Sequence, residues 1–111
     1  RRIKGERNKM NKKVLLWLLE NGFNFTNRGV EYLADSICVY HNNHNIGFCN
    51  LYQNVSNKYD VLPHSIERCM RNAIQTQWRK TTFYKYNKRT PNVSEVIRLL
   101  ELIYFEGGND E

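Results

Sequence analysis

The sequence predicts an all-α fold, a small bundle of about five or six helices that contains a helix-turn-helix. Apolar residues recur at spacings of three and four along most of the 111-residue chain, and no segment shows the alternation of a strand. A short turn that ends in Pro63 separates two of the expected helices. Hydrophobic residues make up 41% of the chain, which is enough apolar surface for one core.

The first expected helix covers residues 10–20 and stops at Asn21-Gly22, because glycine commonly ends a helix. Apolar residues are nearly continuous over residues 14–19, so we expect this helix to be buried on most sides. Residues 1–9 are strongly basic and are expected to form a linker or tail. Because the chain begins with Arg1 rather than Met, we expect that linker to continue from a longer protein.

Two helices are expected next. Residues 24–27 offer capping side chains, and an amphipathic pattern then predicts a helix over residues 28–40, with its apolar face formed by Val30, Leu33, Ala34, Ile37 and Cys38. Residues 41–45 form a polar loop. A third helix is expected over residues 48–59, with an inner face made by Leu51, Tyr52, Val55 and Tyr59.

A fourth helix is expected over residues 63–78, since proline is well tolerated in the first turn of a helix. Its apolar stripe consists of Ile66, Cys69, Met70, Ala73, Ile74 and Trp78. The remaining residues are polar and are expected to face solvent. The turn before this helix is so short that the third and fourth helices have the expected geometry of a helix-turn-helix.

The last expected helix covers residues 93–105, after a polar and aromatic segment, residues 80–89, with at most one helical turn. Asn92 and Glu95 can form a capping box at its start, and residues 107–111 are expected to be a tail. The domain would therefore span residues 10–106. The apolar face of this helix is wider than an isolated domain needs, so we expect a dimer or partner surface at Leu99, Leu102 and Phe105.

The charge distribution favours a polyanionic partner such as nucleic acid. The net charge is +6 and the pI about 9.4. One basic cluster lies before residue 14, and a second lies between Arg68 and Arg89, where no acidic residue occurs. A solvated basic surface is the alternative interpretation of both clusters.

The polar face of residues 63–78 carries the residue types that read base edges in the major groove. Arginine binds guanine, Asn or Gln binds adenine, and a carboxylate accepts from cytosine. We therefore expect base reading by Ser65, Glu67, Arg68, Arg71, Asn72 and Gln75. Phosphate contacts are expected from His64, Arg79, Lys80, Lys85, Lys88 and Arg89. An ordinary polar helix face is the alternative.

Three blocks of the sequence resemble the C-terminal DNA-binding domain of the sporulation master response regulator of endospore-forming bacteria. They are Leu51-Tyr52 with Val55 and Tyr59, then Ile66-Glu67-Arg68 with Arg71, Ala73-Ile74 and Trp78, and then Pro91 followed by Ser94-Glu95-Val96-Ile97. The resemblance covers most of residues 10–105. The resemblance implies a six-helix fold in which the helix of residues 63–78 lies in the major groove. It also implies that Glu67 and Arg68 approach bases and that the region of the last helix makes dimer contacts.

Two departures from that family pattern bear on the expected function. Ser65 stands where the family has a base-contacting arginine, so the resemblance implies a different preferred DNA sequence. The segment of residues 79–89 is shorter than its family counterpart, which puts the family's small helix before the last one in question.

Other kinds of site find less support in the sequence. Cys38, His41, His44 and Cys49 could ligate zinc, but their spacing matches no structural zinc motif, so we expect no metal and no cofactor. The chain has three cysteines, Cys38, Cys49 and Cys69. This odd number argues against a disulfide framework and for a reducing compartment. No apolar run approaches the length of a membrane span, so we expect a cytoplasmic protein without membrane contact.

We expect sequence-specific binding to duplex DNA that regulates transcription, as the output domain of a response-regulator-like bacterial protein. An enzyme is not expected, since the sequence has no nucleophile with a base, paired carboxylates or phosphate-binding glycine loop. One alternative is an interaction module that docks RNA polymerase or another regulator. Another is single-stranded nucleic-acid binding, with bases stacked on Phe83, Tyr84 and Tyr86. A homodimer on DNA is also expected.

Overall fold

The computed structural model describes residues 2–25 and 28–107, with side chains from Lys9 onward. These residues form five α-helices, namely α1 (Arg2–Glu20), α2 (Arg28–Asn42), α3 (Phe48–Tyr59), α4 (Pro63–Gln77) and α5 (Val93–Glu106). Two short 3₁₀ helices, η1 (Trp78–Lys80) and η2 (Thr82–Lys85), lie between α4 and α5. No strand occurs in the described ranges, so the all-α prediction is confirmed.

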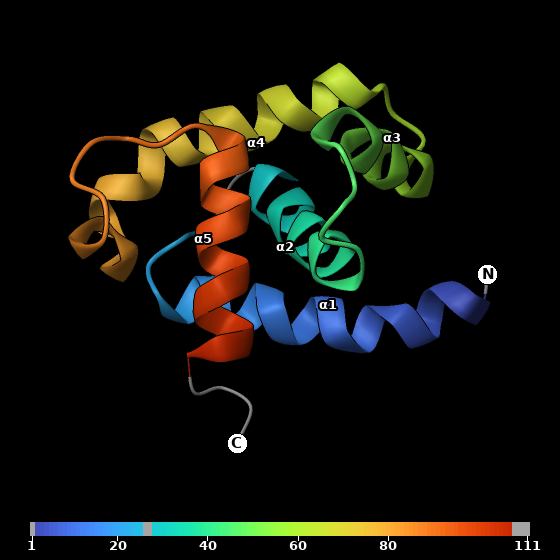
Figure 1. The fold of residues 1–111 in the computed structure, drawn as a ribbon, viewed down its shortest axis with the longest axis horizontal. Coiled ribbons are helices and arrows are strands. Elements are labelled where there is room, and N and C mark those ends of the chain that lie inside the picture. Colours follow the sequence, from blue (N-terminus) through green and yellow to red (C-terminus); the bar gives the residue numbers. More distant parts are fainter. Residues whose placement is uncertain (1, 26–27, 108–111) are drawn as a thin grey trace.

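Helix α2 lies at the centre of the bundle and contacts α1, α3, α4 and α5 (Figure 1). In Figure 1, α1 runs along the bottom and α4 along the top, on opposite sides of α2. Most of α2 is consequently buried, including Val30, Leu33 and Ile37, whose relative exposure is zero. None of the described helices is long and apolar enough to cross a membrane.

Several helix boundaries follow the expected local signals. Helix α3 has the expected bounds. The capping box of α5 is present, since the Asn92 side chain accepts from the Glu95 amide at 2.9 Å and the Glu95 carboxylate accepts from the Asn92 amide at 3.0 Å. Helix α2 continues to Asn42, and α4 gives way to η1 at Trp78. The expected cap residues 26–27 and the tail residues 108–111 lie outside the described ranges.

Two expectations for α1 were wrong. The helix begins at Arg2 rather than at Met10, because residues 2–9 contain no proline and are rich in Arg, Lys and Glu, which favour helix. It is also not buried on most sides. Val14 and Leu18 are fully buried, whereas Leu16 is 59% exposed. Residues four apart share one helix face, so a helix that packs along Val14 and Leu18 turns Leu16 toward solvent.

An aromatic cluster fixes the segment that follows α4. The Phe83 ring lies 5.1 Å from Trp17 and 6.1 Å from Trp78 between ring centroids, and Trp17 also meets Tyr104 at 5.0 Å. The Trp78 indole donates its N–H to the Asn87 carbonyl at 2.8 Å. The 3₁₀ segment is therefore held to α1 despite its polar composition, and Trp17 links this cluster to Tyr104 on α5.

Gly22 allows the end of α1 to approach this segment closely. Its φ is +114°, and a Cβ atom there would lie 2.7 Å from both the Lys80 carbonyl oxygen and the Thr81 Cα. Beside it, the Thr82 amide donates to the Asn21 carbonyl at 2.9 Å, and the Thr82 hydroxyl donates to the Asn21 side chain at 2.7 Å. Only glycine satisfies both the backbone angle and the close approach.

We expect Gly22→Ala to lower the free energy of unfolding by about 1–3 kcal/mol, the usual cost of one strained backbone position. Urea unfolding followed by circular dichroism measures this loss. The matched control is Gly47→Ala, because a Cβ at Gly47 meets nothing within 4 Å and its φ is −74°. An equal loss in both variants would contradict the close approach at Gly22.

A buried carboxylate joins α1, α2 and α3. Asp35, whose side chain is 5% exposed, accepts hydrogen bonds from the Asn11 amide, the Tyr59 hydroxyl and, at 3.2 Å, the Lys58 ammonium group. Burial raises the pKa of Tyr59 above its ordinary value, and the hydrogen bond to Asp35 and the charge of that carboxylate raise it further. Buried charges are tolerated when they are paired and hydrogen-bonded, as here.

Candidate nucleic-acid interface

Helices α3 and α4 are joined by a turn of three residues, Asp60 to Leu62. Asp60 adopts the left-handed conformation, with φ 59° and ψ 44°, which Asp tolerates better than most residues. Its amide and that of Val61 both donate to the Ser56 carbonyl, at 2.8 and 3.3 Å. Pro63 then begins α4. This connection has the length that a helix-turn-helix requires.

The inner face of α4 fixes the orientation of its outer face. Ile66, Met70 and Ala73 are fully buried, and α4 packs on both α2 and α3. The Ser36 hydroxyl on α2 contacts the Met70 sulfur at 3.4 Å. Because this stripe is held by two helices, the opposite side of α4 points consistently away from the bundle.

The outer face of α4 carries the side chains predicted to read bases. Arg68, Asn72 and Gln75 lie at spacings of four and three and are exposed, as is Arg71 beside them. Ser65 and Glu67 are half-buried, because they lie on the two flanks where this face meets the apolar stripe. All the predicted base-reading residues thus reach the surface of a single helix.

Glu67 and Arg71 form an ion pair along this face. The Arg71 Nη1 lies 3.5 Å from the Glu67 Oε1, and the two side chains are 44% and 31% exposed. Such an exposed pair contributes little to stability and can open when a ligand competes for the guanidinium group. Burial, followed by the negative charge of Glu67, raises the pKa of the neighbouring Tyr52 to about 12.

The predicted phosphate-contacting residues lie at both ends of α4. His64 lies in its first turn, whereas the other residues follow its C-terminal end, on η1, η2 and the loop that leads to α5 (Figure 1). His64, Arg79, Lys80, Lys85, Lys88 and Arg89 are all exposed. A helix of this length spans about 22 Å, so the two groups lie well apart along one side of the bundle.

The loop after α4 presents its charges beside tyrosine rings. Lys85 Nζ lies 5.3 Å from the Tyr86 ring centroid, and Lys88 Nζ lies 5.5 Å from that of Tyr84. Phe83, by contrast, is 2% exposed. The expectation that Phe83 stacks a nucleic-acid base was therefore wrong, because its ring is packed between Trp17 and Trp78 in the core.

A comparison with protein-family models matches residues 14–101 to the family described as sporulation initiation factor Spo0A C terminal. The chain belongs to this family. The Spo0A C-terminal domain is a DNA-binding effector domain, and this family is not an enzymatic one. The match includes α2, α3, α4 and the loop before α5. A comparison with curated proteins found no match.

The predicted partner surface on α5 is only partly exposed. Leu102 is 55% exposed, whereas Leu99 and Phe105 are half-buried. The Phe105 ring lies parallel to the His41 ring with 3.6 Å between centroids. Leu102 is therefore the most accessible apolar side chain of the three.

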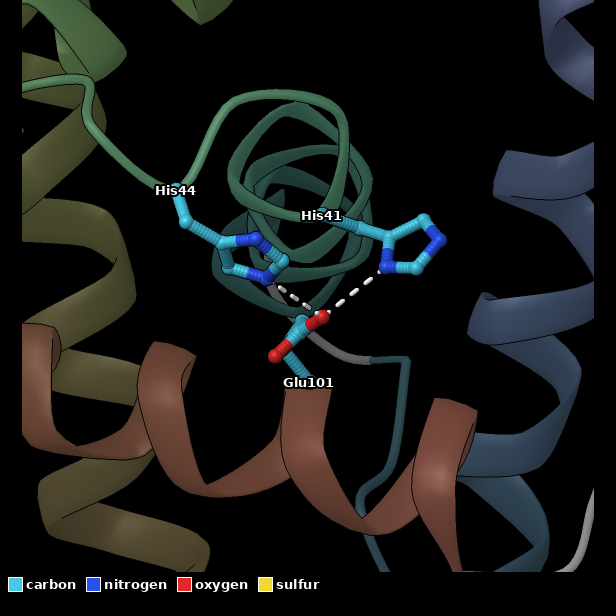
Figure 2. Close-up of side chains that lie close together, drawn as sticks. All are labelled: His41, His44 and Glu101. Atoms are coloured by element: carbon cyan, nitrogen blue, oxygen red, sulfur yellow. Dashed lines mark hydrogen bonds and ion pairs between the residues drawn. The ribbon is translucent and has the colours of Figure 1, made fainter.

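The structure also brings together three polar side chains, of which the sequence had connected only the two histidines. His41 and His44 point toward Glu101 on α5 (Figure 2). Burial alone would raise the pKa of Glu101, but hydrogen bonds and charge from the two histidines bring it below its ordinary value. One signal could have revealed the group, because Glu101 lies four residues after Ile97, on the apolar face of α5.

The cysteines considered with these histidines do not belong to the same group. Cys38 is buried on α2, and this burial, with a smaller contribution from Asp35, raises the pKa of its thiol to about 12. Cys49 is exposed on α3. Cys38, Cys49 and Cys69 are free thiols.

Proposed function

We propose that this domain binds duplex DNA sequence-specifically through a helix-turn-helix made by α3 and α4, and so regulates transcription. It would serve as the output domain of a response-regulator-like protein and carry no catalytic activity. The observation that supports this most is the exposed face of α4, which presents Arg68, Arg71, Asn72 and Gln75 after a three-residue turn. These side chains offer the donors and acceptors that distinguish bases in the major groove.

In this proposal α4 enters the major groove, and the residues near its N-terminus approach the base edges. Arg68 and Arg71 would bind guanine, and Asn72 and Gln75 would bind adenine. Ser65 and Glu67 would contact bases from the two flanks of the helix. A serine hydroxyl is too short to span two acceptors on guanine, so Ser65 would discriminate bases less than a longer side chain.

The basic residues at the two ends of α4 would contact the DNA backbone. His64 would contact a phosphate beside the turn, and the exposed charges from Arg79 to Arg89 would contact phosphates beyond the other end of the helix. Such contacts position a protein on DNA without reading its sequence. They would contribute to specific and non-specific binding alike.

We expect Lys85→Gln and Lys88→Gln each to reduce the slope of log K against log salt by about one, because each would remove one phosphate contact. Fluorescence anisotropy with a labelled duplex at several salt concentrations measures the slope. Lys13→Gln is the matched control, since Lys13 is exposed on α1, across α2 from α4 (Figure 1). An unchanged slope in both loop variants would show that the loop lies off the DNA.

Comparison of duplex with single-stranded DNA of the same sequence tests the proposed function against its alternatives. We expect strong, salt-dependent binding to the duplex and weaker binding to the single strand. Equal binding to every single strand would indicate base stacking instead, for which Tyr86, 54% exposed, is the most accessible ring. Absence of binding to either form would indicate an interaction module.

The α5 surface would contact a second copy on DNA or RNA polymerase. Exposed Leu102 supports this proposal, with Leu99 and Phe105 beside it.

A cytoplasmic location is part of the proposed DNA-binding function, because the DNA target lies in the cytoplasm in bacteria.

A further inference from the structure

Three potential metal ligands converge where the end of α2 meets α5. His41 Nδ1 lies 2.8 Å and His44 Nε2 lies 2.9 Å from the same oxygen, Glu101 Oε2. The three side chains together place their ligand atoms within 4.8 Å of one another. Figure 2 shows both rings directed at the carboxylate, with their other nitrogens turned away from it.

Aromatic neighbours hold both imidazole rings in this orientation. The Phe105 ring stacks on His41 at 3.6 Å with an interplanar angle of 4°. The Tyr40 ring meets His44 edge to face at 4.8 Å. The short loop is also ordered by its own hydrogen bonds, since the Asn45 amide donates to the Asn43 side chain at 3.0 Å. Both rings are therefore already directed at the carboxylate before any ion binds.

The local electrostatics favour a cation at this point. The Glu101 side chain is only 8% exposed, and among the side chains that the structure describes it pairs with no Lys or Arg, only with the two histidines. The last carbonyls of α2 also lie here, at the negative end of the helix dipole. A bound cation would neutralise a buried carboxylate that otherwise relies on imidazole hydrogen bonds.

We propose that His41, His44 and Glu101 bind a divalent transition-metal ion, with zinc as the best match. Two imidazoles and one carboxylate form a ligand set that zinc accepts, with bond lengths of about 2.0–2.2 Å that place tetrahedral ligand atoms about 3.4 Å apart. To reach this spacing the carboxylate withdraws by about half an ångström, and the two imidazole nitrogens, up to 4.8 Å apart, approach each other by up to about 1.4 Å, which rotation of the more exposed His44 side chain allows. Each nitrogen that faces Glu101 must give up the proton that it donates to the carboxylate, and the neutral ring then carries its single proton on the nitrogen that points away from Glu101.

The proposed site has room for a further ligand from solvent, because His41 and His44 are 39% and 55% exposed. The ion would join residues that lie 57 and 60 positions apart in the sequence. Binding to the folded state alone would therefore stabilise the domain. It would also tie α5 to the end of α2. This inference does not depend on DNA binding, so its test and that of the proposed function are independent.

Isothermal titration of the metal-free protein with zinc chloride tests the site, with cobalt(II) as a spectroscopic substitute. We expect about one ion per chain, a higher melting temperature in zinc, and the intense visible absorption of tetrahedral cobalt. His44→Gln should weaken zinc binding tenfold or more, because even loss of an outer partner of a metal ligand typically costs 10- to 100-fold. Glu101→Gln, which keeps the side-chain size, should have a similar effect.

Two control variants separate this site from other zinc ligands. His64→Gln removes the exposed histidine of α4 and should leave zinc affinity unchanged. Cys49→Ser removes the exposed thiol and should also leave it unchanged. Because His44 is exposed, its variant tests the site even if Glu101→Gln fails to fold. Equal zinc affinity in wild type and His44→Gln, loss of binding in Cys49→Ser, or no binding by wild type would each overturn the proposal.

Discussion

Replacement of Asp35 with alanine should lower the free energy of unfolding by about 3–5 kcal/mol, the usual cost of breaking a buried charge pair. The change removes an acceptor that Asn11, Lys58 and Tyr59 share. These donors come from α1 and α3, so the loss would affect the packing of both helices against α2. Replacing the carboxylate with a methyl group removes an acceptor from three half-buried donors and also leaves a small cavity.

Chemical denaturation followed by circular dichroism measures this effect. Glu20→Ala is the matched control, because Glu20 is an exposed carboxylate at the end of α1 and should change stability by no more than about 0.5 kcal/mol. Asp35→Asn should fall between the two, since it keeps an acceptor oxygen but removes the charge. A loss below about 1 kcal/mol for Asp35→Ala would contradict the role of this carboxylate.

The double substitution Arg68→Ala with Arg71→Ala should weaken binding to the preferred DNA site by about 2–6 kcal/mol, since each bidentate contact contributes about 1–3 kcal/mol. Binding to random duplex DNA should fall much less, because that binding depends on phosphate contacts. Stability should change little. Both side chains are exposed, and the Glu67–Arg71 pair is too accessible to contribute much.

Fluorescence anisotropy with the preferred site and with a random duplex distinguishes these two losses. The double substitution Lys12→Ala with Lys13→Ala on α1 is the control, because it also removes two exposed positive charges but lies across the bundle from α4. If the double variant kept its affinity for the preferred site, α4 would not be the reading helix.

Local sequence signals were sufficient for much of the fold. The bounds of α3 and the capping box at Asn92 depend on neighbouring residues, and the sequence predicted both. The outer face of α4 was also predictable, because helical periodicity separates Arg68, Asn72 and Gln75 from the apolar stripe without knowledge of what covers that stripe.

Features that depend on distant contacts were not predictable in the same way. The apolar run of α1 does not reveal that only its Val14 and Leu18 side packs on the bundle. Phe83 lies in a polar segment, and its burial depends on Trp17 and Trp78. The partners of Asp35 and Glu101 lie between 23 and 60 residues away in the sequence. A charged residue within the apolar face of α5 was the available signal for Glu101, whereas Asp35 lies beside the apolar stripe of α2 and gave no such signal.

Selection of bound sites from random duplex DNA tests the central proposal most directly. We expect a defined site to be enriched, with guanine at the positions that face Arg68 and Arg71 and little preference where Ser65 approaches the bases. The same selection with the double arginine variant should lose that guanine preference. Recovery of random sequences by the wild-type domain, or the same site from both proteins, would contradict sequence reading by α4.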